Sequence, residues 1–326
     1  MNVVERFQTG LVLGGIVVGL GAGQIAGVPT IAESLLLPFL IVMLFAAFAG
    51  IPLSKLRRAF GNRRVLGASL GVNFLWNPLL AVALGAAFLV DHPALWVGLL
   101  MLLVTPCTDW YLIFTDLANG NVPLATSLLP YNLVLQLVLL PVYLSVFAGT
   151  LVDLQLGFLL ESVLLVLFVP LVLAVVVRRI VVTQKGETWL ENRFTPILGP
   201  TQVVFLSLAI AAMFASQGDV LLERPDVLAV LAVPVLAFYG INFLLGLAIG
   251  RVLDFSYGEL ACFNCTILSR NSPTALAIAV VAFPNEPLIA LALVIGPLLE
   301  LPLLAVVSRL LRGVDERGWD DLETVS

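Results

Sequence analysis

The chain has 326 residues, of which 60% are hydrophobic and only 11% are charged, with a formal net charge of −5. Soluble globular proteins carry about 25% charged residues, so this composition excludes a water-soluble fold and predicts an all-α membrane protein in a lipid bilayer. No basic stripe suggests nucleic-acid binding. The single histidine and three cysteines form no metal-ligand pattern, so we expect neither a metal nor another cofactor.

Apolar runs of the length needed to cross a bilayer, about 20 residues, recur along the whole chain. They predict ten transmembrane helices near residues 10–28, 32–52, 66–90, 94–117, 122–149, 157–181, 196–216, 226–250, 259–284 and 286–311. No seam of small residues is prominent enough to predict an oligomer, so the oligomeric state stays undecided.

The lysines and arginines predict the orientation of these spans, because cytoplasmic loops carry an excess of both residues. With the N-terminus inside, 14 of the 16 basic residues fall on the cytoplasmic side. Only Arg224 falls outside and only Arg270 lies within a span. We therefore expect a multi-pass protein with both termini in the cytoplasm.

Sequence echoes between the two halves indicate an inverted repeat of five plus five spans. The pairs, in the same order in each half, are Gly71–Leu75 with Gly240–Leu244, Pro106 with Pro273, and Pro141 with Pro302. They predict a first repeat over residues 1–153, a second over 154–313, and a short acidic cytoplasmic tail over 314–326. Inverted repeats are typical of secondary carriers, whereas the alternative is an unrelated ten-helix bundle with coincidental matches.

Two of the spans, the fourth and the ninth, contain polar runs around a proline. Proline breaks a helix, and irregular backbone at membrane depth must be covered by protein or line a cavity. We expect these two breaks to cross and to form the substrate site. The predicted breaks are at Pro106 and Pro273, and the predicted substrate-binding residues are Cys107, Thr108, Asp109, Arg270, Asn271 and Ser272.

Three side chains of this region could carry chemistry. A charge within a span is costly and usually pairs, so Asp109 and Arg270 predict an ion pair that either changes during transport or is purely structural. Glu300, between two prolines in an apolar helix, is predicted to carry protons, as Asp109 could; a structural glutamate is the alternative. The thiol of Cys107 could bind a soft, thiophilic solute or fill apolar space, whereas Cys262 and Cys265 are interpreted as packing.

The motifs around the fourth and tenth spans resemble those of the bile acid–sodium symporter superfamily, most closely its arsenical-resistance-3 branch of arsenite exporters. The Pro106–Thr108 run matches the Pro-Cys-Thr of that branch, and Ile295–Pro302 matches its Ile-Gly-Pro-Leu-(Ile/Val)-Glu-Val-Pro stretch. The resemblance implies the same fold, metalloid recognition by the cysteine and transport through the glutamate. The resemblance covers essentially the whole chain, and its departures from that branch include Arg270 in the ninth span and Asp109 after Thr108.

The resemblance implies efflux of arsenite or antimonite in exchange for protons, at a bacterial or archaeal plasma membrane. The alternative is an organic-anion carrier of the same superfamily without the usual sodium ligands, in which Arg270 binds the anion. The same comparison implies that the charge of Arg270 stands in for a bound cation. Either solute is small and is an anion or a metalloid. An intramembrane enzyme is not expected, because the spans hold no second buried aspartate and no histidine.

Overall fold

The computed structural model describes residues 8–50, 62–107, 110–147, 164–223 and 226–316, together with residues 149, 157, 161 and 319. Helices account for most of them, and these residues contain no β-strand beyond one isolated bridge. The helices are α2 (Gln8–Gly23), α3 (Val28–Gly50), α5 (Arg63–Gly71), the π-helical turn η2 (Val72–Trp76), α6 (Asn77–Phe88), α7 (Pro93–Leu103), α8 (Trp110–Leu117), α9 (Val122–Phe147), the π-helical turn η4 (Leu164–Phe168), α11 (Val169–Lys185), α12 (Glu187–Trp189), the π-helical turn η5 (Leu190–Phe194), α13 (Thr195–Glu223), α14 (Asp226–Val252), α15 (Tyr257–Leu268), α16 (Ser272–Ala282) and α17 (Pro287–Asp315).

The all-α membrane fold is confirmed. Seven helices among the described residues are long and apolar enough to cross a membrane. Helices fit a bilayer because they satisfy their backbone hydrogen bonds internally. The remaining predicted spans correspond to α2, which has 16 residues, and to two pairs of short helices, α7 with α8 and α15 with α16. The count of ten crossings and the inverted repeat remain predictions.

The chain folds into two compact units, and each unit contains helices from both predicted repeats. The first unit holds α2, α3, α11 to α13, nearly all of α16 and the start of α17. The second holds α5 to α9, nearly all of α14, α15 and the rest of α17. The predicted boundary between the repeats, at residue 153, refers to symmetry between two halves of the sequence, whereas the two units are defined by contacts in space. The repeats therefore stay a prediction.

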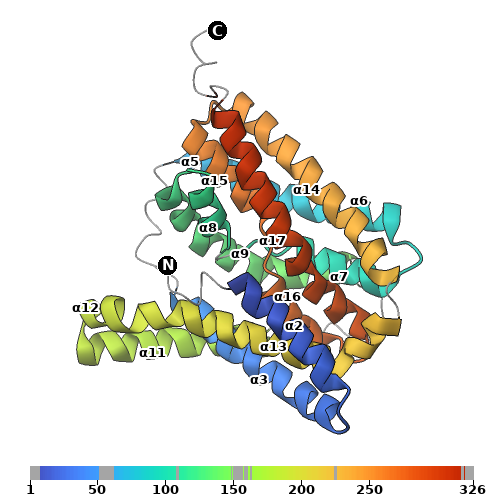
Figure 1. Cartoon of the computed structure of the whole chain (residues 1–326). Coiled ribbons are helices and arrows are strands. Elements are labelled where there is room, and N and C mark those ends of the chain that lie inside the picture. Colours follow the sequence, from blue (N-terminus) through green and yellow to red (C-terminus); the bar gives the residue numbers. More distant parts are fainter. Residues whose placement is uncertain are drawn as a thin grey trace. The chain divides into compact units, whose positions relative to one another are not determined.

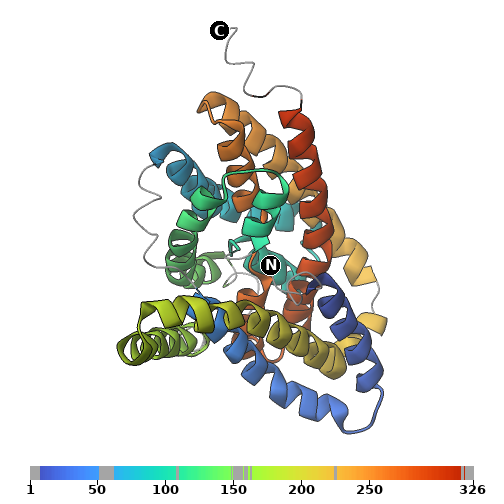
Figure 2. The same cartoon turned by 60° about the vertical axis from the view of Figure 1, so that its left-hand side comes forward.

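In the first unit, α13 packs along both α2 and α3 (Figure 1, Figure 2). Three glycines of α2 at four-residue spacing, Gly15, Gly19 and Gly23, lie directly against the main chain of α13. A Cβ atom at Gly19 would lie 2.4 Å from the carbonyl oxygen of Ala211. This is the small-residue packing that lets membrane helices approach closely, and here it joins two helices of one chain.

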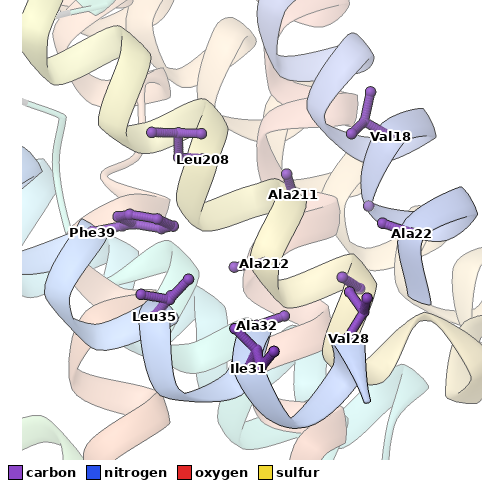
Figure 3. A pocket seen from close by; sticks show the side chains of 12 residues that line it. Val18, Ala22, Val28, Ile31, Ala32, Leu35, Phe39, Leu208, Ala211 and Ala212 are labelled. Carbon is purple, nitrogen blue, oxygen red and sulfur yellow. The ribbon is translucent and has the colours of Figure 1, made fainter. Parts of the chain in front are cut away.

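An apolar cavity of about 220 Å³ lies between the same three helices. Figure 3 shows side chains of α2, α3 and α13, among them Val18, Phe39 and Leu208, pointing toward it. All twelve residues that line it are apolar. The cavity therefore offers no group that could recognise a polar solute.

In the second unit, α15 is the central helix and packs against α5, α8 and α9. Every residue from Leu260 to Leu268 is buried. The helix begins at a capping box, in which Ser256 and Glu259 satisfy each other's backbone N–H groups. The Glu259 carboxylate also accepts a hydrogen bond from Asn62, whose own side chain caps α5. These contacts fix the starts of α5 and α15 against each other.

The C-terminal segment is attached to this unit through Trp319. Its indole N–H donates to the carbonyl oxygen of Phe255 at 2.8 Å, and the guanidinium carbon of Arg251 lies 4.0 Å from its ring centroid. Only 6% of the Trp319 side chain is exposed.

Candidate functional site

The two interrupted spans are joined at their breaks. The chain leaves helix between α7 and α8 and again between α15 and α16, and Pro106 and Arg270 face each other there in an antiparallel bridge. The bridge has two main-chain hydrogen bonds, from Cys107 N–H to Ser269 O at 3.0 Å and from Asn271 N–H to Thr105 O at 2.7 Å. Backbone groups freed by the breaks are thus satisfied by the other break, as irregular backbone inside a membrane requires.

Cys107 lies at this bridge with 3% of its surface exposed. Its Sγ atom accepts a hydrogen bond from the backbone N–H of Trp110, the first residue of α8, at 3.2 Å. This hydrogen bond holds the thiol at the junction of the two breaks. The predicted neighbours Thr108 and Asp109 lie outside the described residues, and so does the predicted ion pair of Asp109 with Arg270.

The guanidinium of Arg270, only 1% exposed, is surrounded by oxygen atoms. It donates from Nη1 to Leu103 O at 2.9 Å, from Nη2 to Asn73 Oδ1 at 2.9 Å, Ile267 O at 2.6 Å and Thr266 O at 3.4 Å, and from Nε to Leu268 O at 3.4 Å. The ring of Phe238 lies 5.4 Å from its central carbon. Buried charge is tolerated only when it is fully hydrogen-bonded, and this arrangement meets that condition with neutral oxygens.

Glu300 of α17 reaches the same bridge from another side. Its Oε1 accepts the main-chain N–H of Arg270 at 2.7 Å, and 3% of the residue is exposed. The buried phenol of Tyr239 interacts electrostatically with Glu300, Arg270 and Cys107. Its hydroxyl has no hydrogen-bond partner among the described residues. One thiol, one carboxyl and one phenol therefore gather around the junction of the breaks.

The remaining predicted residues belong to the second break. Asn271 is 8% exposed and contributes to the bridge through its main chain, whereas Ser272 is the first residue of α16 and is buried. The Ser272 hydroxyl lies against Gly296 of α17, where an added Cβ atom would be 2.7 Å from it. Pro273 occupies the second position of α16, where a proline is compatible with helix because the N–H it lacks has no partner there anyway.

A set of buried asparagines, which the sequence reasoning did not assign to the site, supports Arg270. Asn73 accepts from Arg270 and also from Asn77 Nδ2 at 3.3 Å. Asn77 in turn accepts from Asn242 Nδ2 at 3.0 Å, and Asn242 accepts from the indole N–H of Trp76 at 3.0 Å. Asn73 and Trp76 lie in the π-helical turn η2, a feature frequent at functional sites. The sequence did contain a signal for this network: Asn73 and Asn242 lie in the matching runs Gly71–Leu75 and Gly240–Leu244. An asparagine in an apolar span is costly unless it has a hydrogen-bond partner, so both could have been expected to pair.

Comparisons with known proteins agree with this architecture. A model of the family described as "Sodium Bile acid symporter family" matches residues 37–224. An arsenical-resistance protein Acr3 of Corynebacterium glutamicum is 29% identical over 319 residues, which cover 93% of this chain and 84% of that protein. An uncharacterized transporter of Synechocystis is 25% identical, and the match covers 94% of this chain and 88% of that protein. An arsenical-resistance protein Acr3 of Alkaliphilus metalliredigens is 23% identical, and the match covers 94% of this chain and 91% of that protein.

Proposed function

Since this chain belongs to the Sodium Bile acid symporter family, and is thus a multi-pass membrane transporter, we propose that it exports arsenite or antimonite in exchange for protons. The observation that carries the proposal is the buried thiol of Cys107 at the junction of two broken helices. Two relatives named as arsenical-resistance proteins, matched over nearly the whole chain, support the choice of solute.

Cys107 is the proposed contact for the metalloid. Arsenic(III) and antimony(III) are soft centres, and thiolate is the soft ligand among protein side chains. The N–H of Trp110 donates to Sγ at 3.2 Å and so orients the thiol at the break. A single thiol bound to the metalloid is easier to release than a set of three, which suits a carrier that must discharge its solute.

Glu300 is the proposed proton carrier. As a carboxylate it can only accept hydrogen bonds, and it accepts one from the Arg270 main chain at the bridge. Protonation turns one of its oxygens into a donor and weakens that bond, because charged acceptors make stronger hydrogen bonds than neutral ones. Proton binding at Glu300 would therefore weaken its hydrogen bond to the backbone that joins the two breaks.

The second candidate function, an organic-anion carrier organised around Arg270, has weaker support. The five hydrogen bonds of its guanidinium all go to protein oxygens. An anionic solute would have to displace some of them and leave carbonyl groups without a partner, at a cost of about 1–3 kcal/mol for each group.

We place the protein in the plasma membrane with both termini in the cytoplasm. The support is the concentration of 14 of the 16 basic residues on one side of the predicted spans. In this orientation, everted vesicles expose the cytoplasmic side and turn export into uptake that can be measured.

Arsenite uptake into everted vesicles, with and without an imposed proton gradient, tests the proposal. Wild type should accumulate arsenite when the interior is acidic, Cys107→Ala should lose at least about 90% of that uptake, and Glu300→Gln should lose its dependence on the gradient. Cys262→Ala is the matched control, because Cys262 is a fully buried thiol within α15. No arsenite or antimonite uptake by folded wild type would reject the proposal and favour the anion carrier.

A further inference from the structure

Tyr239 of α14 places a buried hydroxyl beside the junction of the two breaks. Its neighbour Phe238 has a ring centroid 5.6 Å from that of Tyr239 and 5.4 Å from the guanidinium carbon of Arg270. The Tyr239 phenol also interacts electrostatically with Glu300 and Cys107. Two independent kinds of contact therefore place this side chain next to the groups that the proposed function uses.

The hydroxyl of Tyr239 has no hydrogen-bond partner in the part of the chain that the structure describes, although the residue is only 4% exposed. A buried hydroxyl without a hydrogen bond is unfavourable, and such groups are rare enough in folded proteins to point to a bound molecule. Tyr143 of α9 has the ordinary arrangement, since its hydroxyl donates to Phe74 O at 2.6 Å. Among the described residues, by contrast, the protein supplies no acceptor or donor for Tyr239.

Two serine hydroxyls of the second break share this property. Ser269 and Ser272 are at most 1% exposed, and neither hydroxyl has a partner among the described residues. The main-chain carbonyl of Ser269 accepts the N–H of Cys107 at 3.0 Å. The Ser272 hydroxyl lies against Gly296, which is one turn before Glu300 on the same face of α17. Three such hydroxyls therefore lie around the thiol and the carboxyl of the proposed site.

The solute of the proposed function carries groups that match these hydroxyls. Arsenite at neutral pH is the uncharged trihydroxide As(OH)₃. When the Cys107 thiol binds it, an S–As bond forms, one As–O bond breaks, and the thiol proton leaves with the released hydroxide as water. Two hydroxyls remain on arsenic, and each can both donate and accept a hydrogen bond. Methylarsonous acid, CH₃As(OH)₂, keeps only one hydroxyl after the same step.

We propose that Tyr239 is a substrate-binding residue, whose hydroxyl, together with those of Ser269 and Ser272, holds the hydroxyl groups of the metalloid on Cys107. The inference rests on the proposed function and adds the basis of its selectivity. A hydroxyl on arsenic forms a hydrogen bond at this position, whereas a carbon substituent leaves the buried phenol without a partner, which disfavours such a substrate. The site therefore prefers the trihydroxides of arsenic and antimony to organoarsenicals.

Tyr239→Phe removes this hydroxyl and keeps the ring. In everted vesicles it should raise the arsenite concentration for half-maximal uptake by about 3–10-fold, which corresponds to the loss of one hydrogen bond. Inhibition of that uptake by methylarsonous acid should change much less, because its single remaining hydroxyl can bond to a serine. The preference for arsenite should thus narrow, and Ser269→Ala should narrow it in the same direction.

Thermal unfolding in detergent, without any solute, separates a binding role from a structural one. Tyr239→Phe should leave the Tm unchanged or raise it, because no hydrogen bond to a described residue is lost. Tyr143→Phe is the matched control. It should lower the Tm by about 2 °C, since Phe74 O loses its donor, and it should leave the preference for arsenite unchanged.

Two results would overturn the inference. An unchanged preference for arsenite in Tyr239→Phe would show that its hydroxyl does not touch the solute. A fall in its Tm as large as that of Tyr143→Phe would show that the hydroxyl is bonded within the protein instead. If either is found while wild type takes up arsenite and Cys107→Ala does not, only this inference fails. If folded wild type takes up no arsenite or antimonite, the proposed function fails and this inference fails with it.

Discussion

Replacing Asn73 with leucine removes a supporting oxygen from Arg270 while keeping the side-chain volume. Asn73 Oδ1 accepts from the guanidinium at 2.9 Å and from Asn77 at 3.3 Å. A hydrogen bond to a charged group contributes about 1.5–3 kcal/mol and a neutral one about 1 kcal/mol. We therefore expect a loss of about 3 kcal/mol in the free energy of unfolding, because no cavity forms but the buried charge loses a partner.

Asn132→Leu provides the matched control within the same network. Asn132 is equally buried, but its Nδ2 has no hydrogen-bond partner among the described residues and its Oδ1 accepts only a long bond of 3.5 Å from Asn73. Its replacement should change stability by less than about 1 kcal/mol, since little hydrogen bonding is lost.

Thermal unfolding in detergent distinguishes the two asparagine variants. At about 2 °C for each kcal/mol, Asn73→Leu should lower Tm by roughly 6 °C and Asn132→Leu by no more than about 2 °C. In an Arg270→Met background the cost of Asn73→Leu should shrink, because contacting residues are not additive. Equal losses for the two asparagines, or an undiminished cost without the arginine, would refute the role assigned to Asn73.

Three further substitutions test the packing. Gly19→Ala should destabilise the protein by about 1–3 kcal/mol in thermal unfolding, because its Cβ atom would lie 2.4 Å from a carbonyl oxygen of α13, whereas Gly21→Ala on the same helix meets nothing within 4 Å and should be neutral. Cys262→Ala should retain most arsenite uptake in vesicles, since that thiol lies within helix α15; a loss as large as that of Cys107→Ala would contradict its assignment to packing. Trp319→Ala should lower the free energy of unfolding by about 1–2 kcal/mol in the same assay, because its 2.8 Å hydrogen bond and its stacking on Arg251 are lost. An unchanged Tm would show that the C-terminal contact does not stabilise the fold.

The sequence alone determined the features that depend on neighbouring residues. Apolar runs of membrane length specify helices wherever lipid excludes water, and the structure confirms the all-helical membrane fold. Proline interrupts a helix through its own missing N–H and its own ring. Pro106 lies at the first break itself, whereas Pro273 lies in the first turn of α16, just after the second break. Each break therefore has a nearby proline as a local signal, and the motifs that carry Cys107 and Glu300 are local as well.

Only the tertiary structure decided how the buried charge is stabilised. From the sequence, Arg270 was expected to pair with Asp109, which lies outside the described residues, while its described partners are carbonyl oxygens and Asn73, 197 positions away. The glycine seam between α2 and α13 likewise joins residues far apart in the chain. Local pattern fixes where a helix ends, because proline and hydropathy act on neighbouring residues. Which helix end then meets a given charge depends on how distant helices pack, and no short segment of the chain contains that information.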